Sequence, residues 1–166
     1  MKLNMALSLR SAGLSDAFHF SSFVELRQSL PSLVEAISPF VDQLMQFVKK
    51  FRSRDGSEVD IEIALREALT NAIVHGNHED PEKRVYVGTR CSQDGEVSFT
   101  IRDQGKGFDY LVLPDPTAPW NRVSLHGRGI YLMRALMDEV RFEESGTVVK
   151  MRKEPNGGPT AQSKSR

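Results

Sequence analysis

Apolar residues recur every three or four positions in two stretches of the chain, residues 31–51 and 57–74. Such spacing lines one side of a helix with apolar groups, so each stretch predicts an amphipathic helix. Pro31 suits the first position of the earlier helix. Pro39 predicts a kink or a break in it, because proline lacks an amide hydrogen and crowds the preceding turn. Ser57, with an acid three residues later, resembles a capping box for the second helix.

Strict alternation of apolar and polar residues marks two other segments, residues 85–91 and 97–101. Asp94-Gly95 lies between them, and this pair favours the tight turn of an antiparallel hairpin. Three prolines fall within residues 109–126, which predicts a long loop of functional character. The remaining pattern predicts strands at residues 18–28, 139–144 and 147–153, and a helix at residues 129–137.

This order of elements predicts an α+β fold. We expect a two-layer α/β sandwich, with a mainly antiparallel mixed sheet and the helices on one face. Residues 1–15 are expected to form a flexible N-terminal arm, and residues 154–166, rich in Pro, Gly, Ser and Lys, a disordered tail. Residues 16–153 are then one domain, a normal size for a single hydrophobic core.

Charge and cysteine content narrow the class of protein. Lys+Arg and Asp+Glu both number 22, so the net charge is zero, which excludes an extended surface for duplex nucleic acid or an anionic membrane. Cys91 is the single cysteine, which excludes an intrachain disulfide and a cysteine-based zinc site. The first 13 residues lack the apolar core of a signal peptide. We therefore expect a cytoplasmic protein that contacts neither nucleic acid nor membrane directly.

Three groups of residues could carry chemistry. Glu67, Asn71 and His75 are four residues apart and so share one face of the second predicted helix. On its own this pattern fits a solvated helix face as well as a polar site. His75 could equally be a structural residue that bonds the following loop.

The other two groups are rich in glycine. Asp103 follows a predicted strand and precedes Gly105 and Gly107, so a flat ligand could approach its carboxylate closely, although an ordinary turn has the same composition. Gly127 and Gly129 open the last predicted helix, where free amide groups can bind an anion, or where the chain simply enters the helix. Neither pattern matches the Walker or Rossmann phosphate motifs.

Taken together and in this order, the three groups resemble the GHKL (Bergerat-fold) ATPase superfamily, and within it the bacterial anti-sigma factor serine/threonine-protein kinases. The resemblance is carried by residues 67–77, 103–108 and 126–133 and spans about residues 18–153. It implies ATP and Mg²⁺ as cofactors and Glu67 as the catalytic base. Asn71 would hold Mg²⁺, and Asp103 would accept a hydrogen bond from the adenine amino group. The implied nucleotide-binding residues are Asn71, Asp103, Gly105, Gly107, Phe108, Gly127, Arg128, Gly129 and Ile130.

The resemblance also implies a function. We expect an anti-sigma factor that phosphorylates a serine of a STAS-domain anti-anti-sigma protein and that binds a sigma factor. A homodimer is a further expectation from the resemblance. A non-catalytic module in which ATP only shapes a partner-binding surface is an alternative. A detached ATPase module of a phosphorelay is a third, although the chain lacks the helix pair that would carry a phosphoacceptor histidine.

Overall fold

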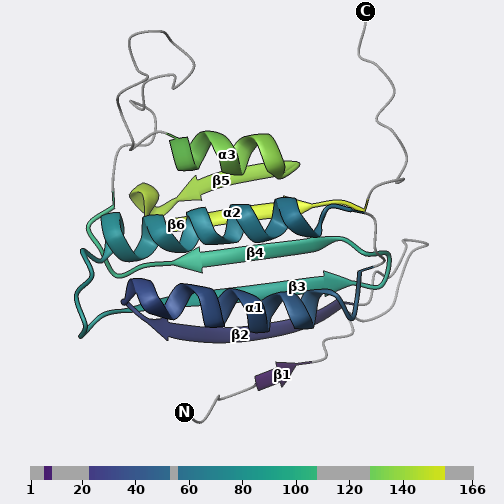
Figure 1. Cartoon of the computed structure of the whole chain (residues 1–166), viewed down its shortest axis with the longest axis horizontal. Coiled ribbons are helices and arrows are strands. Elements are labelled where there is room, and N and C mark those ends of the chain that lie inside the picture. The colour runs from purple at the N-terminus through teal and green to yellow at the C-terminus, as the bar shows by residue number, and fades with distance from the viewer. Residues whose placement is uncertain (1–5, 9–22, 53–55, 108–127, 156–166) are drawn as a thin grey trace, which may run out of the picture.

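The computed structural model describes residues 6–8, 23–52, 56–107 and 128–155 (Figure 1). Helices cover one face of a twisted antiparallel sheet, which confirms the predicted two-layer α+β architecture. The helices are α1 (Ile37–Val48), α2 (Glu58–Thr70) and α3 (Arg128–Leu136). The strands are β1 (Ala6–Ser8), β2 (Phe23–Pro31), β3 (Arg84–Ser92), β4 (Val97–Arg102), β5 (Glu139–Glu143) and β6 (Val148–Lys153).

The strands lie in the order β1-β2-β3-β4-β6-β5. Every pair among the described strands is antiparallel, so the expectation of a mixed sheet is wrong. The helices α1 and α2 lie between β2 and β3 in the chain, α3 lies between β4 and β5, and short turns join β3 to β4 and β5 to β6. Ala6–Ser8 fall in the predicted N-terminal arm, yet they pair with β2. The rest of that arm and most of the predicted tail lie outside the described residues.

The predicted hairpin is present. β3 and β4 pair from Cys91 opposite Val97 to Tyr86 opposite Arg102, and Gly95 in the turn has a φ of 92°. Alternate residues of β3 are buried, as the sequence pattern predicts. Their side chains meet those of α1 and α2 in one core, which includes Val41, Leu65 and Phe99, each at most 1% exposed.

Three details of the predicted helices are wrong. Pro31 ends β2 instead of opening a helix, and a 3-10 turn at Val34–Ala36 leads into α1. Pro39 therefore lies in the first turn of α1, where no intrahelical partner for an amide hydrogen exists, so the helix runs on without a break. Ser57 precedes α2 but its hydroxyl makes no capping bond; it accepts a hydrogen bond from Nε of Arg52 at 3.0 Å instead.

Arg52 is a buried arginine that donates hydrogen bonds to backbone carbonyls at one end of the sheet. Its guanidinium donates to the carbonyl of Gly95 at 2.7 Å, and to the carbonyls of Lys153 and Glu154 at 3.2 and 2.5 Å. These groups belong to the β3–β4 turn and to the end of β6. The arginine therefore joins the connection between α1 and α2 to the end of the sheet where β4 begins and β6 ends.

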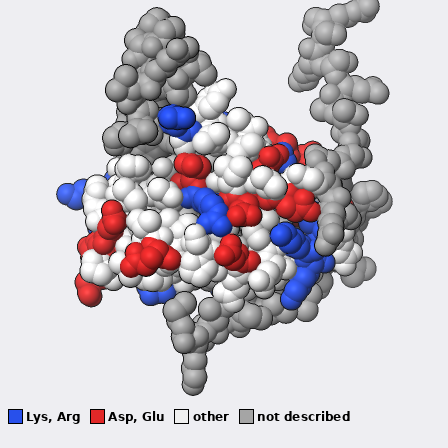
Figure 2. Space-filling model, in the orientation of Figure 1, with Lys and Arg blue, Asp and Glu red and all other residues white. Residues whose placement is uncertain are grey.

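The helical face carries acidic and basic side chains scattered together (Figure 2). Arg66 on α2, for example, pairs with Glu62 at 2.9 Å and with Asp42 on α1 at 3.2 Å. Exposed pairs of this kind contribute little to stability. None of the helices in the described part of the chain combines the length and the apolar character that crossing a bilayer requires.

Candidate active site

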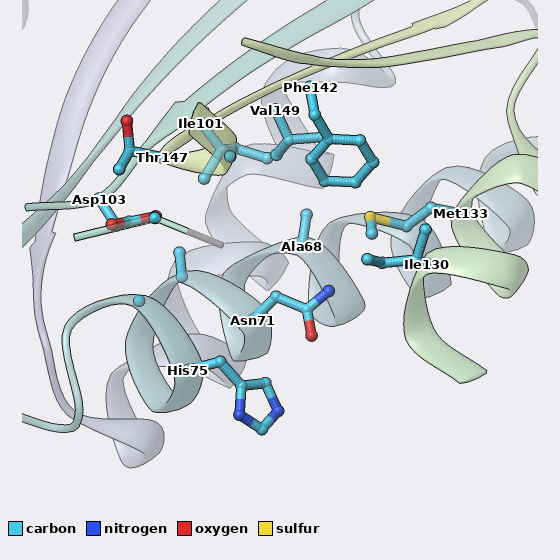
Figure 3. Close-up of a pocket in the computed structure, with 14 residues that line it drawn as sticks. Ala68, Asn71, His75, Ile101, Asp103, Ile130, Met133, Phe142, Thr147 and Val149 are labelled. Carbon is cyan, nitrogen blue, oxygen red and sulfur yellow. The ribbon is translucent and has the colours of Figure 1, made fainter. Parts of the chain in front are cut away.

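A cavity of about 240 Å³ opens between α2, α3 and the ends of β4 and β6 (Figure 3). Most of its wall is apolar, formed by Ile101, Ile130, Met133, Phe142 and Val149. The polar side chains of the cavity, among them Asn71, Asp103 and Thr147, lie at the ends of helices and strands, outside the hydrophobic core. A slot of this kind suits a flat ring that needs many apolar contacts and few hydrogen bonds.

Asp103 supplies the carboxylate of this cavity. Its amide donates to the carbonyl of Thr147 at 3.0 Å, and its Oδ1 accepts from the amide of Gly105 at 2.7 Å. Burial raises the pKa of the Asp103 carboxyl above its ordinary value, and the bond from Gly105 opposes this shift. The side chain is thus fixed in place, half-buried, with acceptor capacity left for a ligand.

Glycines pack around Asp103 where side chains would not fit. A β-carbon on Gly76 would lie 2.5 to 2.8 Å from the atoms of the Asp103 carboxyl group. A β-carbon on Gly105 would overlap the carbonyl of Gly76, and one on Gly107, which has a φ of 75°, would overlap the carbonyl of Ser145. Packing within the protein therefore requires glycine at these three positions, and the approach of a ligand past Gly105 and Gly107 stays a prediction.

The second polar group lies where α2 meets α3. A β-carbon on Gly129 would lie 2.5 Å from Oε2 of Glu67 and 3.6 Å from both Nδ2 and Oδ1 of Asn71. Glu67 and Asn71, which the helical spacing places on one face, therefore lie against the first turn of α3 and form one cluster with it. The amides of that first turn have no partner within the helix, and its dipole favours negative charge.

Asn71 connects this cluster to the cavity, because it also lines the cavity. Its Nδ2 is buried and makes no hydrogen bond to the described residues. A buried amide that the fold leaves unused costs stability, and a ligand that engages it removes that cost. Amide oxygens are among the ligands that Mg²⁺ accepts. The unused Nδ2 could donate a hydrogen bond to a phosphate oxygen, and Oδ1 of the same amide could bind Mg²⁺, so Asn71 fits a magnesium-bound phosphate group.

The remaining predicted residues divide into three groups. Ile130 is buried and lines the cavity, whereas Arg128 is exposed and does not line it. His75 is exposed and lies one turn beyond Asn71 on the same side of the helix (Figure 3). Phe108, Gly127 and the predicted loop 109–126 lie outside the described residues.

Asn77, next to the cavity-lining Gly76, is fully buried and has no role predicted from the sequence. Residues Asn71–Gly76 form a π-helical turn, which ends where the amide of Asn77 donates to the carbonyl of Ala72 at 2.8 Å. Its side-chain Oδ1 accepts from the amide of Gln104 at 2.7 Å. A polar residue directly after a glycine at the end of a helical pattern was the only signal for it in the sequence.

Comparison with known proteins identifies the family of this chain. Residues 30–153 match the family described as Histidine kinase-like ATPase domain. The chain is 27% identical over 165 residues to the anti-sigma F factor of Priestia megaterium, covering 92% of this chain and 93% of the relative. It is 32% identical over 139 residues to the serine-protein kinase RsbW of Staphylococcus epidermidis, covering 78% and 84%.

A third relative matches over a shorter stretch. The chain is 37% identical over 92 residues to the anti-sigma F factor of Heyndrickxia coagulans, and the match covers 52% of this chain and 63% of that relative. The matched family covers the α2, β4 and α3 segments that build the cavity. The chain therefore belongs to the histidine kinase-like (GHKL) ATPase family, in its branch of anti-sigma factor serine kinases.

Proposed function

We propose that this protein binds ATP with Mg²⁺ in the described cavity and phosphorylates a serine of a STAS-domain anti-anti-sigma protein, and that it also binds a sigma factor. Family membership supports the kinase activity, and the names of the relatives support the partners. The observation that carries the proposal is the cluster of Glu67, Asn71 and Gly129 at one end of the cavity.

Each residue of the site has a role that its position allows. Asp103 would accept a hydrogen bond from the adenine amino group, with the ring between the apolar walls. Asn71 would supply its side-chain oxygen to Mg²⁺, and the first amides of α3, including that of Gly129, would donate to the phosphates. We count Gly105, Gly107, Ile130, Arg128, Phe108 and Gly127 with the same nucleotide site.

ATP would supply the phosphoryl group, and Mg²⁺ would neutralise part of its charge. Glu67, one helical turn from Asn71, would accept the proton of the attacking serine hydroxyl. Phosphoryl transfer depends mainly on positioning and charge neutralisation. Mg²⁺ and the first amides of α3 would supply the charge neutralisation, and the position of Glu67 against the first turn of α3 would place the base.

The experiment is a transfer assay with Mg²⁺, labelled ATP and each STAS-domain protein encoded in the same genome. We expect label on a serine of one of them. Glu67→Gln should abolish transfer while ATP binding, measured by calorimetry, persists. Glu62→Gln is the matched control, because Glu62 lies on the same helix and pairs only with Arg66 among the described residues.

The outcomes separate the possible functions. Undiminished transfer by Glu67→Gln would remove Glu67 from the mechanism. ATP binding by the wild-type chain without transfer to any STAS-domain protein would identify a non-catalytic module in which ATP controls partner binding. A wild-type chain that binds no ATP would contradict the proposal as a whole.

A further inference from the structure

Asn77 belongs to a closed ring of three hydrogen bonds beside the Asp103 carboxylate. The amide of Gln104 donates to Oδ1 of Asn77 at 2.7 Å, and Nδ2 of Asn77 donates to the carbonyl of Arg84 at 3.1 Å. The amide of Arg84 donates to Oε1 of Gln104 at 2.7 Å, which closes the ring. Three segments meet there: the end of the π-helical turn, the start of β3 and the turn after β4.

The ring acts on the residue that follows Asp103. Asp103 is already held by Thr147 through its amide and by Gly105 through its carboxyl oxygen. The bond from Gln104 to Asn77 fixes the next peptide, so the backbone on the C-terminal side of Asp103 is fixed to the helix that carries Asn71. Asn77 is 0% exposed and uses both ends of its amide in this ring.

We infer that Asn77 is a positioning residue that sets the preference of this site for adenine over guanine. This inference rests on the proposed role of Asp103 in binding the base. Adenine presents an amino donor at position 6, whereas guanine presents a carbonyl acceptor there. A carboxylate that cannot move aside repels that carbonyl, but one on a loosened turn can swing away from it. The ring adds to the rigid placement of Asp103 by fixing the next peptide, and this placement determines the discrimination.

The test compares Kd values for ATP and GTP, each with Mg²⁺, by calorimetry. Asn77→Ala removes two bonds of the ring, and we expect the ratio of GTP Kd to ATP Kd to fall about tenfold. Gln104→Ala removes one bond, at an exposed side chain whose loss the fold tolerates, and should lower the ratio by a smaller factor in the same direction. It keeps the test decisive if Asn77→Ala fails to fold.

Ser57→Ala is the control for a general loss of stability. Ser57 is 1% exposed, and its hydroxyl accepts from Arg52 at the end of the sheet remote from Asp103. This variant should be destabilised and yet keep the wild-type ratio of Kd values, because a merely structural loss does not favour one base. An unchanged ratio in Gln104→Ala and in folded Asn77→Ala would overturn the inference while leaving ATP binding intact. Failure of the wild-type chain to bind ATP would overturn the proposed function and this inference with it.

Discussion

Replacement of Gly129 by alanine tests the proposed mechanism at its most crowded point. The added β-carbon would lie 2.5 Å from Oε2 of Glu67, so the carboxylate must retreat by about 0.9 Å to reach an ordinary contact of 3.4 Å. Asn71 is at 3.6 Å and need not move. The amide of residue 129 is also kept, so the phosphate contacts of α3 are preserved.

The substitution should therefore lower the rate of phosphate transfer without lowering the stability of the protein. A displacement of about 1 Å in a reacting group can lower the rate about 10²-fold, or about 2.7 kcal/mol in activation free energy. The free energy of unfolding should stay level or rise by up to about 1 kcal/mol, because alanine is favoured over glycine in a helix. We expect a folded protein that binds ATP normally and transfers phosphate slowly.

The assay is single-turnover transfer to the STAS-domain substrate at saturating ATP, with calorimetry for the ATP Kd and thermal unfolding for stability. Gly88→Ala is the control, because a β-carbon there would meet Thr100 at an ordinary 3.9 Å. A wild-type rate constant in Gly129→Ala would refute the requirement that Glu67 sit against the first turn of α3. A large loss of ATP affinity would show that Gly129 serves mainly to admit the phosphates.

Three further predictions follow from the site and the core. Gly76→Ala should raise the ATP Kd about tenfold or more with little change in the transfer rate at saturating ATP, because its β-carbon would displace the Asp103 carboxylate. Titration calorimetry and the transfer assay measure the two quantities. Asp103→Asn should stabilise the ATP-free protein at neutral pH and weaken ATP binding about tenfold or more. Burial raises the pKa of the Asp103 carboxyl above 3.8, so the wild-type free energy of unfolding should fall as pH rises above that value, whereas the affinity for ATP should rise. Thermal unfolding and calorimetry across pH test the two effects. Identical pH profiles in Asp103→Asn would refute the assignment. Burial raises the pKa of the Cys91 thiol to about 12, so iodoacetamide at pH 8 should modify Cys91 in urea but not in the native protein. Mass spectrometry measures the modification, and rapid labelling of the native protein would contradict the buried position of Cys91.

Much of the fold could be predicted because local patterns and tertiary burial agree. The β3–β4 hairpin follows from alternation around Asp94-Gly95, and the buried face of α2 follows from its helical spacing. Pro39 was misleading because the start of α1 depends on a 3-10 turn that no periodic pattern marks. Ser57 was misleading because the guanidinium of Arg52, five residues earlier, donates to its hydroxyl in place of a capping amide.

The site was predictable in part for a similar reason. The helical period places Glu67 and Asn71 on one face, but only the packing of α3 against α2 brings Gly129 to them. The role of Asn77 depends on bonds to Gln104 and Arg84, which are 27 and 7 residues away in sequence. Such a ring exists only once three segments have met, so no local pattern could predict it.

Arg52 and the cavity stand at opposite ends of β4 and β6. The guanidinium binds the carbonyls where β4 starts and β6 finishes, whereas Asp103 follows β4 and bonds Thr147, which precedes β6. The residues that stabilise the sheet and the residues that form the cavity thus lie at opposite ends of the same strands. Substitutions that change which ligand the cavity binds can therefore accumulate during evolution without breaking the hydrogen bonds of Arg52 at the other end. The sheet is kept while the chemistry of the site diversifies.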